Sequence, residues 1–123
     1  MRKAAAVSVV LVALTLAAGC GHRAGLDDYR SFAHRAAGAG LWREALDRWE
    51  RADELAHDDP GILNNLAVAH EALGDIPLAR ELYERAVALA PDDDELRENL
   101  LAFRKAHPEL YPPEETDETD EVD

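Results

Sequence analysis

The sequence predicts an all-α protein, arranged as a short solenoid of helix-turn-helix units. The first observation is an internal repeat: when the chain is compared with itself at a shift of 34 residues, Gly40 aligns with Gly74 and Trp49 with Tyr83. The second is that no segment alternates between apolar and polar residues with the period of two that marks a half-buried strand. Repeated units of this length stack along a line, and each unit buries its apolar face against its neighbours.

The first unit, about residues 26–59, has the side chains that two packed antiparallel helices need. Large side chains are expected to fill the space between the helices, at Tyr29, Phe32 and Trp49. Small side chains allow the two backbones to approach each other, at Ala33, Ala45 and Ala52.

Glycine, aspartate and proline mark the ends of the predicted helices. Gly40 and Gly74 suit the left-handed turn that follows the first helix of each pair. Asp59 and Asp75 suit the N-cap position, where a carboxylate accepts from free backbone N–H groups, and a proline follows each in the first turn. Acidic and basic residues four apart on a helix are expected to pair, as at Glu81–Arg85.

A fifth helix, about residues 93–106, is expected to close the array. Leu96 aligns with Ile62 of the second unit. No partner helix is predicted after it, because prolines follow at positions 108, 112 and 113. The folded domain is therefore predicted to cover residues 26–106, as two repeats and a C-terminal capping helix.

The second unit, about residues 60–93, resembles the tetratricopeptide repeat (TPR) family. Its large and small residues stand at the spacing of that family's pattern, at Leu63, Leu66, Ala67, Gly74, Ala79, Tyr83, Ala86 and Pro91. The first unit departs from the pattern at Ala36, where the family prefers an aromatic residue, and at His57, where it prefers proline. The resemblance implies an interaction module whose first helices line a concave groove for a peptide or protein.

Under this resemblance, eight side chains are expected to line the groove and bind the peptide: Arg30, His34, Asn64, Asn65, Val68, Glu71, Glu98 and Asn99. Asn65 and Asn99 match a position that is often asparagine in peptide-binding members, where the amide can bond to a peptide backbone. Some members clamp a C-terminal carboxylate with two basic residues on the third unit, but this chain has Glu95 and Asn99 there. Each groove residue also has a simpler interpretation as ordinary solvated helix surface.

Residues 1–20, MRKAAAVSVVLVALTLAAGC, are typical of a secretory leader that ends in a lipidation site. The apolar run of 13 residues would span roughly 20 Å as a helix, against a hydrocarbon core of about 30 Å. The small residues before Cys20 resemble the lipobox of bacterial lipoproteins, although Ala17 stands where that family most often has leucine. We therefore expect a lipoprotein signal peptide at 1–19, with a lipidated N-terminus and linker at 20–25. The alternative is an ordinary signal followed by an incidental cysteine.

Residues 107–123 are predicted to be an acidic, disordered tail. Eight acidic residues and no basic residue lie between Glu109 and Asp123. Such a segment buries too little apolar surface to offset its ordering entropy. We expect it to keep the protein soluble; recruitment of a basic partner is the alternative. A calcium loop is not expected, because the segment has no turning glycine.

The composition excludes several classes of function. Acidic residues outnumber basic ones by 26 to 13, whereas nucleic-acid binding needs clustered Lys and Arg, so no nucleic-acid partner is expected. The single cysteine excludes an internal disulfide and a cysteine-rich zinc module. No phosphate-binding loop, HExxH or GxSxG motif occurs. We therefore expect no enzyme activity, catalytic residue, metal or cofactor.

Together, the two resemblances imply an adaptor or scaffold of the bacterial cell envelope, anchored to a membrane by lipid and facing the periplasm or the cell exterior. Envelope TPR lipoproteins act in the assembly of secretion, pilus or cell-wall machinery. Gly21 replaces the aspartate commonly linked to inner-membrane retention, which favours the outer membrane in a two-membrane cell. The alternatives are a structural lipoprotein that forms homo-oligomers, and a non-catalytic accessory subunit of an enzyme complex.

Overall fold

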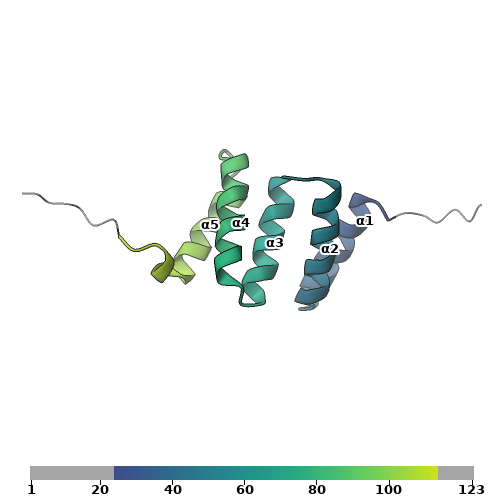
Figure 1. The fold of residues 1–123 in the computed structure, drawn as a ribbon, viewed down its shortest axis with the longest axis horizontal. Coiled ribbons are helices and arrows are strands. Elements are labelled where there is room, and N and C mark those ends of the chain that lie inside the picture. The colour runs from purple at the N-terminus through teal and green to yellow at the C-terminus, as the bar shows by residue number, and fades with distance from the viewer. Residues whose placement is uncertain (1–23, 114–123) are drawn as a thin grey trace, which may run out of the picture.

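The computed structural model describes residues 24–113 as a row of antiparallel helices (Figure 1). The predicted leader, Cys20 and residues 114–123 of the predicted tail lie outside these residues. The helices are α1 (Leu26–Gly38), α2 (Trp42–Leu55), α3 (Pro60–Ala72), α4 (Ile76–Leu89) and α5 (Asp94–Ala106), followed by the short 3-10 helix η1 (Pro108–Leu110). Residues 24–113 contain no strand. The predicted all-α solenoid of two helix pairs and a fifth helix is confirmed.

Most of the predicted end signals work as expected. The Asp59 carboxylate accepts a hydrogen bond from the backbone N–H of Ile62 at 3.0 Å, which caps α3. Gly40 and Gly74 have φ values of +75° and +85°, a conformation that side chains with a Cβ rarely adopt. Asp75 precedes α4 but makes no capping bond; its carboxylate instead lies 3.6 Å from Nδ1 of His70. The predicted cap at Asp75 is therefore wrong.

Alanines bring the two helices of each pair together. Ala33, Ala45 and Ala52 are fully buried beside Trp49 in a first core cluster. A second core cluster joins Ala67, Ala79 and Tyr83 of the second pair to Leu100 and Phe103 of α5. The core is thus a line of contacts along the row of helices, as expected for a solenoid.

Phe32 does not fill the space between two helices as predicted, because its ring is 36% exposed. One repeat later, Leu66 is only 6% exposed, and two repeats later Leu100 is 8% exposed. A preceding helix pair covers these two leucines, whereas no described helix precedes α1. The guanidinium groups of Arg48 and Arg35 instead lie 4.8 and 5.7 Å from the centre of the Phe32 ring.

The folded unit continues beyond Ala106, so the predicted boundary of the disordered tail at residue 107 is wrong. Leu110 and Tyr111 pack against the second core cluster. The Tyr111 hydroxyl donates to Glu84 Oε1 at 3.0 Å, and its ring lies 4.7 Å from the guanidinium groups of both Arg80 and Arg104. A charge count over the whole tail hides these two large side chains at its start.

Candidate functional site

The structure places two of the predicted groove residues in contact with each other. Asn64 is only 5% exposed, and its Oδ1 accepts a hydrogen bond from Nδ2 of Asn99 at 3.1 Å. The prediction that Asn64 presents its amide on the groove surface is wrong, because the side chain is almost fully buried. The reason is that α5 packs over this part of α3, so the amide has to find its partner inside the protein.

Two more of the predicted groove residues are occupied by contacts within the chain. Val68 packs against the second core cluster. Glu71 Oε2 accepts a hydrogen bond from the Tyr83 hydroxyl at 2.9 Å, and Glu71 Oε1 lies 3.5 Å from Nε2 of His107. Burial, together with the Glu71 carboxylate, raises the pKa of Tyr83 well above its usual range. This cluster therefore ties α3, α4 and the segment after α5 together.

The remaining four predicted groove residues keep their side chains more accessible. Arg30 reaches from α1 to the Asp59 carboxylate at 3.7 Å, and His34 sets its ring edge-on to Trp49 with centroids 4.6 Å apart. Asn65 is half-buried and Glu98 is exposed. The eight residues thus do not form one continuous polar site; they divide into structural contacts and a smaller accessible group.

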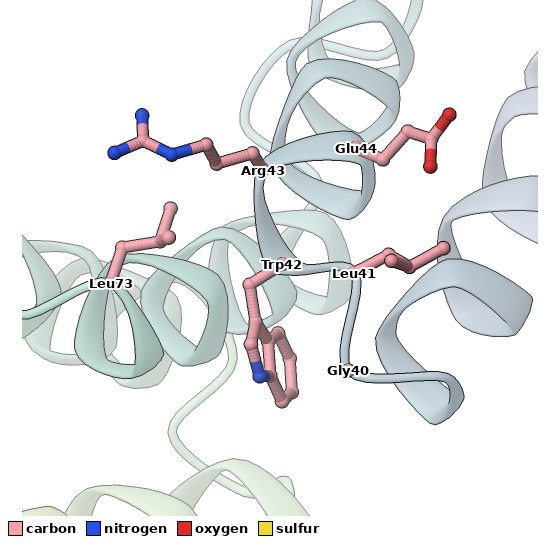
Figure 2. A pocket seen from close by; sticks show the side chains of 6 residues that line it. All are labelled: Gly40, Leu41, Trp42, Arg43, Glu44 and Leu73. Atoms are coloured by element: carbon pink, nitrogen blue, oxygen red, sulfur yellow. The ribbon is translucent and has the colours of Figure 1, made fainter.

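An apolar hollow lies at the turns rather than in the predicted groove. Its volume is about 490 Å³, and it is lined by Gly40, Leu41, Trp42, Arg43, Glu44 and Leu73 (Figure 2). Leu41 is 52% exposed and Leu73 is 37% exposed. In Figure 2, Leu73 points toward the aliphatic stem of Arg43, while Glu44 points away from Leu73. The hollow therefore presents mainly apolar surface from two successive repeats.

The backbone of the first turn places Leu41 in this hollow. Gly40 takes the left-handed conformation, and the N–H of Leu41 then donates to the carbonyl of Ala36 at 2.9 Å. Leu41 stands at the N-cap of α2, where its side chain makes no capping bond. Leucine is among the weakest residues at this position, so helix formation does not explain its presence. That mismatch is the sequence signal that points to this site, which the sequence analysis missed.

The two long edges of the solenoid differ in chemistry. The turns at residues 39–41 and 73–75 lie on one edge, which carries the hollow and is named the apolar edge here (Figure 1). The turns at residues 56–59 and 90–93 lie on the other edge, together with the start of α1. This second edge is named the acidic edge because it carries Asp58, Asp59, Asp92, Asp93 and Asp94.

Residues 60–103, from α3 to near the end of α5, match the sequence profile of the tetratricopeptide repeat family. The helices of this range are of the tetratricopeptide type. TPR units generally mediate contacts between proteins, and the fold is typically a non-catalytic scaffold for such contacts. No curated protein matches the chain.

Two further findings concern the part of the chain that the structure describes. Among residues 24–113, no group of three or more His, Cys, Asp or Glu side chains is placed to hold a metal ion. No helix in this range is both long and apolar enough to cross a membrane.

Proposed function

We propose that this chain is a lipid-anchored interaction adaptor of the bacterial envelope, which binds another protein along the apolar edge of its TPR unit. The observation that supports this choice of surface is the exposure of Leu41 and Leu73 around the hollow of about 490 Å³. Contiguous exposed apolar surface of this kind is typical of protein-binding sites. Trp42, half-buried in the wall of the hollow, adds an aromatic residue of the type that dominates interface energetics.

The position of the proposed anchor supports the same choice. Cys20 precedes α1, and α1 begins on the acidic edge. Because α1 has 13 residues and rises 1.5 Å per residue, the apolar edge lies roughly 20 Å farther from the anchor. A protein held at Cys20 would thus turn its apolar edge away from the membrane and toward a partner.

In this proposal the accessible groove residues add polar contacts to the same partner. Arg30, His34, Asn65 and Glu98 can bind a peptide that continues from the apolar edge into the concave face. Asn64, Val68, Glu71 and Asn99 hold the helices in register beneath it. Partner selection would then depend both on apolar contacts at the hollow and on hydrogen bonds or ion pairs with these four polar residues.

Site-specific photocrosslinking in intact cells tests the binding surface. A photoreactive residue at Leu73 should give one discrete crosslinked species, whereas the same residue at exposed Asp92 on the acidic edge should give none. Trp42→Ala should weaken the adduct at Leu73 about tenfold, the loss expected for an aromatic contact worth above 1 kcal/mol. Equal crosslinking at both positions would reject the apolar edge as the binding surface.

Fatty-acid labelling tests the anchor separately. Cys20→Ser should abolish the incorporation of a labelled fatty acid, because it removes the thiol that carries the lipid. The protein should then leave the membrane, since stable anchoring depends on its acyl chains. Equal labelling of the wild type and the variant would reject the lipoprotein assignment. The favoured location, the outer membrane of a two-membrane cell, is tested by separating the two membranes of the labelled cells.

Self-association is the second candidate function, and the exposed ring of Phe32 favours it. In a dimer, a second copy would cover the face of α1 that no described helix covers. Light scattering over a range of concentrations should then give a rising mass that Phe32→Glu lowers to that of one chain. A constant mass for the wild type would exclude this candidate.

A further inference from the structure

Within residues 24–113, no helix covers the outer face of α5 in the way that second helices cover the corresponding faces of α1 and α3. In the first two units, the second helix packs on Ala33 and Ala67, and both are fully buried. The residue at the same repeat position in α5 is Leu101, which is 52% exposed. Among the described residues, a slot is therefore left uncovered where a second helix would follow α5.

The slot has an apolar floor and a basic rim. It forms a hollow of about 280 Å³ lined by Val87, Arg97, Leu100, Leu101 and Arg104. Lys105 is exposed next to Arg104, and no ion pair to another residue of the described range involves it. Arg97 is already paired with Asp94 and donates to the Pro91 carbonyl, so Arg104 and Lys105 are the cations of the rim without a carboxylate partner in the described range. They stand out in a chain whose net charge is −13.

The chain itself leads an acidic segment to this slot. After α5, the ring of Tyr111 lies 4.7 Å from the guanidinium group of Arg104, which also lines the hollow. The described range ends two residues later, at Pro113. The next ten residues, 114–123, contain seven carboxylates and no basic side chain. Ten residues reach up to about 33–36 Å, longer than the roughly 20 Å of α5.

The repeat register supports the same occupant. One 34-residue period after α4 lies the range 110–123, so this segment falls in step with the second helices of both earlier units. In the second unit, Tyr83 of α4 bonds to Glu71 of α3. One period later the equivalent residues are Asp117 and Lys105, which have opposite charges.

We propose that residues 114–123 dock in the slot on α5, where their carboxylates pair with Arg104 and Lys105. The segment covers the open end of the solenoid through charge, in place of the apolar contacts that hold α2 and α4. It lacks the apolar residues of those helices, because Asp117 and Asp120 stand where Tyr83 and Ala86 do one period earlier. The docked state is therefore reversible and sensitive to salt.

A second copy of the chain fits the slot less well. The other open end of the solenoid presents Phe32 between Arg35 and Arg48. Stacking that end on the slot would bring two arginine-rimmed surfaces together, and like charges in contact disfavour association. An acidic segment has the complementary charge.

Digestion by a glutamate-specific protease tests the docking. Its target sites in the segment are Glu114, Glu115, Glu118 and Glu121. With the full chain in detergent micelles at about 10 mM salt, we expect cleavage in this segment to be about three- to tenfold slower than at 0.5 M salt, because salt screens exposed charge pairs. Cleavage of an unrelated acidic peptide in the same tube corrects for the effect of salt on the protease.

Charge variants make the test specific. Lys105→Glu and Arg104→Gln should each speed cleavage at low salt about threefold, as expected for the loss of one exposed charge pair. Arg43→Glu is the matched control for Lys105→Glu, because it changes the net charge equally at an exposed site on the apolar edge. It should leave the cleavage rate unchanged, and circular dichroism should show that all variants remain folded.

Three results would overturn the proposal. One is an equal cleavage rate in the wild type and the Lys105→Glu variant at low salt. Another is the same acceleration in the Arg43→Glu control, which would show a general effect of net charge. The third is protection that grows with protein concentration, which would place the segment on a second copy. None of these results bears on crosslinking at Leu73, so the proposed function stands or falls separately.

Discussion

The side chains of Asn64 and Asn99 join α3 to α5 through a single hydrogen bond of 3.1 Å. Asn64 lies inside the protein, at 5% exposure, while Asn99 is half-buried. A buried amide oxygen that loses its donor costs more than the bond itself contributes. This contact therefore helps to decide whether α5 stays on the solenoid.

Asn99→Ala should destabilise the folded chain, because it leaves Asn64 Oδ1 buried without a partner. The expected loss is about 1–3 kcal/mol. For a folded unit of this size each kcal/mol lowers the melting temperature by about 4–8 °C. Thermal unfolding followed by circular dichroism measures the shift. Asn65→Ala is the control, because Asn65 is half-buried in α3 and its side chain makes no hydrogen bond to another described residue. This variant should melt within about 3 °C of the wild type.

Tyr83 should make stability depend on pH under alkaline conditions. Burial and the bond to Glu71 raise the pKa of Tyr83 above its ordinary value of 10 in the folded chain. The folded state therefore holds this proton more tightly than the unfolded state. The resulting stabilisation is complete below pH 10 and is lost as the pH rises toward the raised pKa.

Urea unfolding at pH 7 and at pH 11 measures this effect. Tyr83→Phe should lose less stability than the wild type between the two pH values, since it has no phenolic proton to lose. Glu71→Gln should fall between them, because it removes the negative charge but keeps an amide oxygen as acceptor. If Tyr83→Phe loses as much stability as the wild type, Tyr83 does not cause the alkaline loss.

Tyr111 should act as a latch for the segment after α5. Tyr111→Ala removes the ring that lies between Arg80 and Arg104 and the bond to Glu84. We expect a melting temperature lower by about 4–8 °C, the shift for about 1 kcal/mol in a unit of this size. Tyr111→Phe keeps the ring and should lose less. A melting temperature equal to that of the wild type in Tyr111→Ala would show that the segment contributes nothing to folding.

Much of the fold follows from local sequence rules. Gly40 and Gly74 mark turns that need a left-handed backbone conformation, which glycine adopts without strain. Asp59 caps α3 with its own carboxylate. The alanines between paired helices are recognisable because their spacing repeats. These features depend on neighbours within one or two turns of helix, so they can be predicted from a single sequence.

Features that depend on position in the array were predicted less well. Phe32 has the residue type of a core position, but it is exposed because no described helix precedes α1. Arg85 pairs with Asp58 in the turn before α3 instead of with Glu81 on its own helix. Sequence spacing cannot foresee this, since the approach of α4 to the turn before α3 depends on how the helices pack. The burial of Asn64 has the same cause, because it depends on how α5 packs.

The apolar edge was missed for a different reason. The TPR resemblance points to polar residues on the first helices, whereas Leu41 lies in a turn. A leucine at an N-cap is unfavourable for the helix, and a second exposed leucine, Leu73, lies in the corresponding turn region of the next unit. Residues that local structure does not require are therefore better guides to this surface than the polar groove positions.

Ala79 provides the most direct test of the packing between α3 and α4. It is fully buried in the second core cluster, where its methyl group lets the two helices approach each other. Ala79→Leu adds three carbon atoms without room for them and should cost about 1–3 kcal/mol. Ala88→Leu, on the exposed side of the same helix, is the matched control and should change the free energy of unfolding by less than about 0.5 kcal/mol. Urea unfolding of both variants compares the two positions directly. A loss in Ala88→Leu as large as that in Ala79→Leu would contradict the close helix contact, because the cost would then come from the leucine and not from the site.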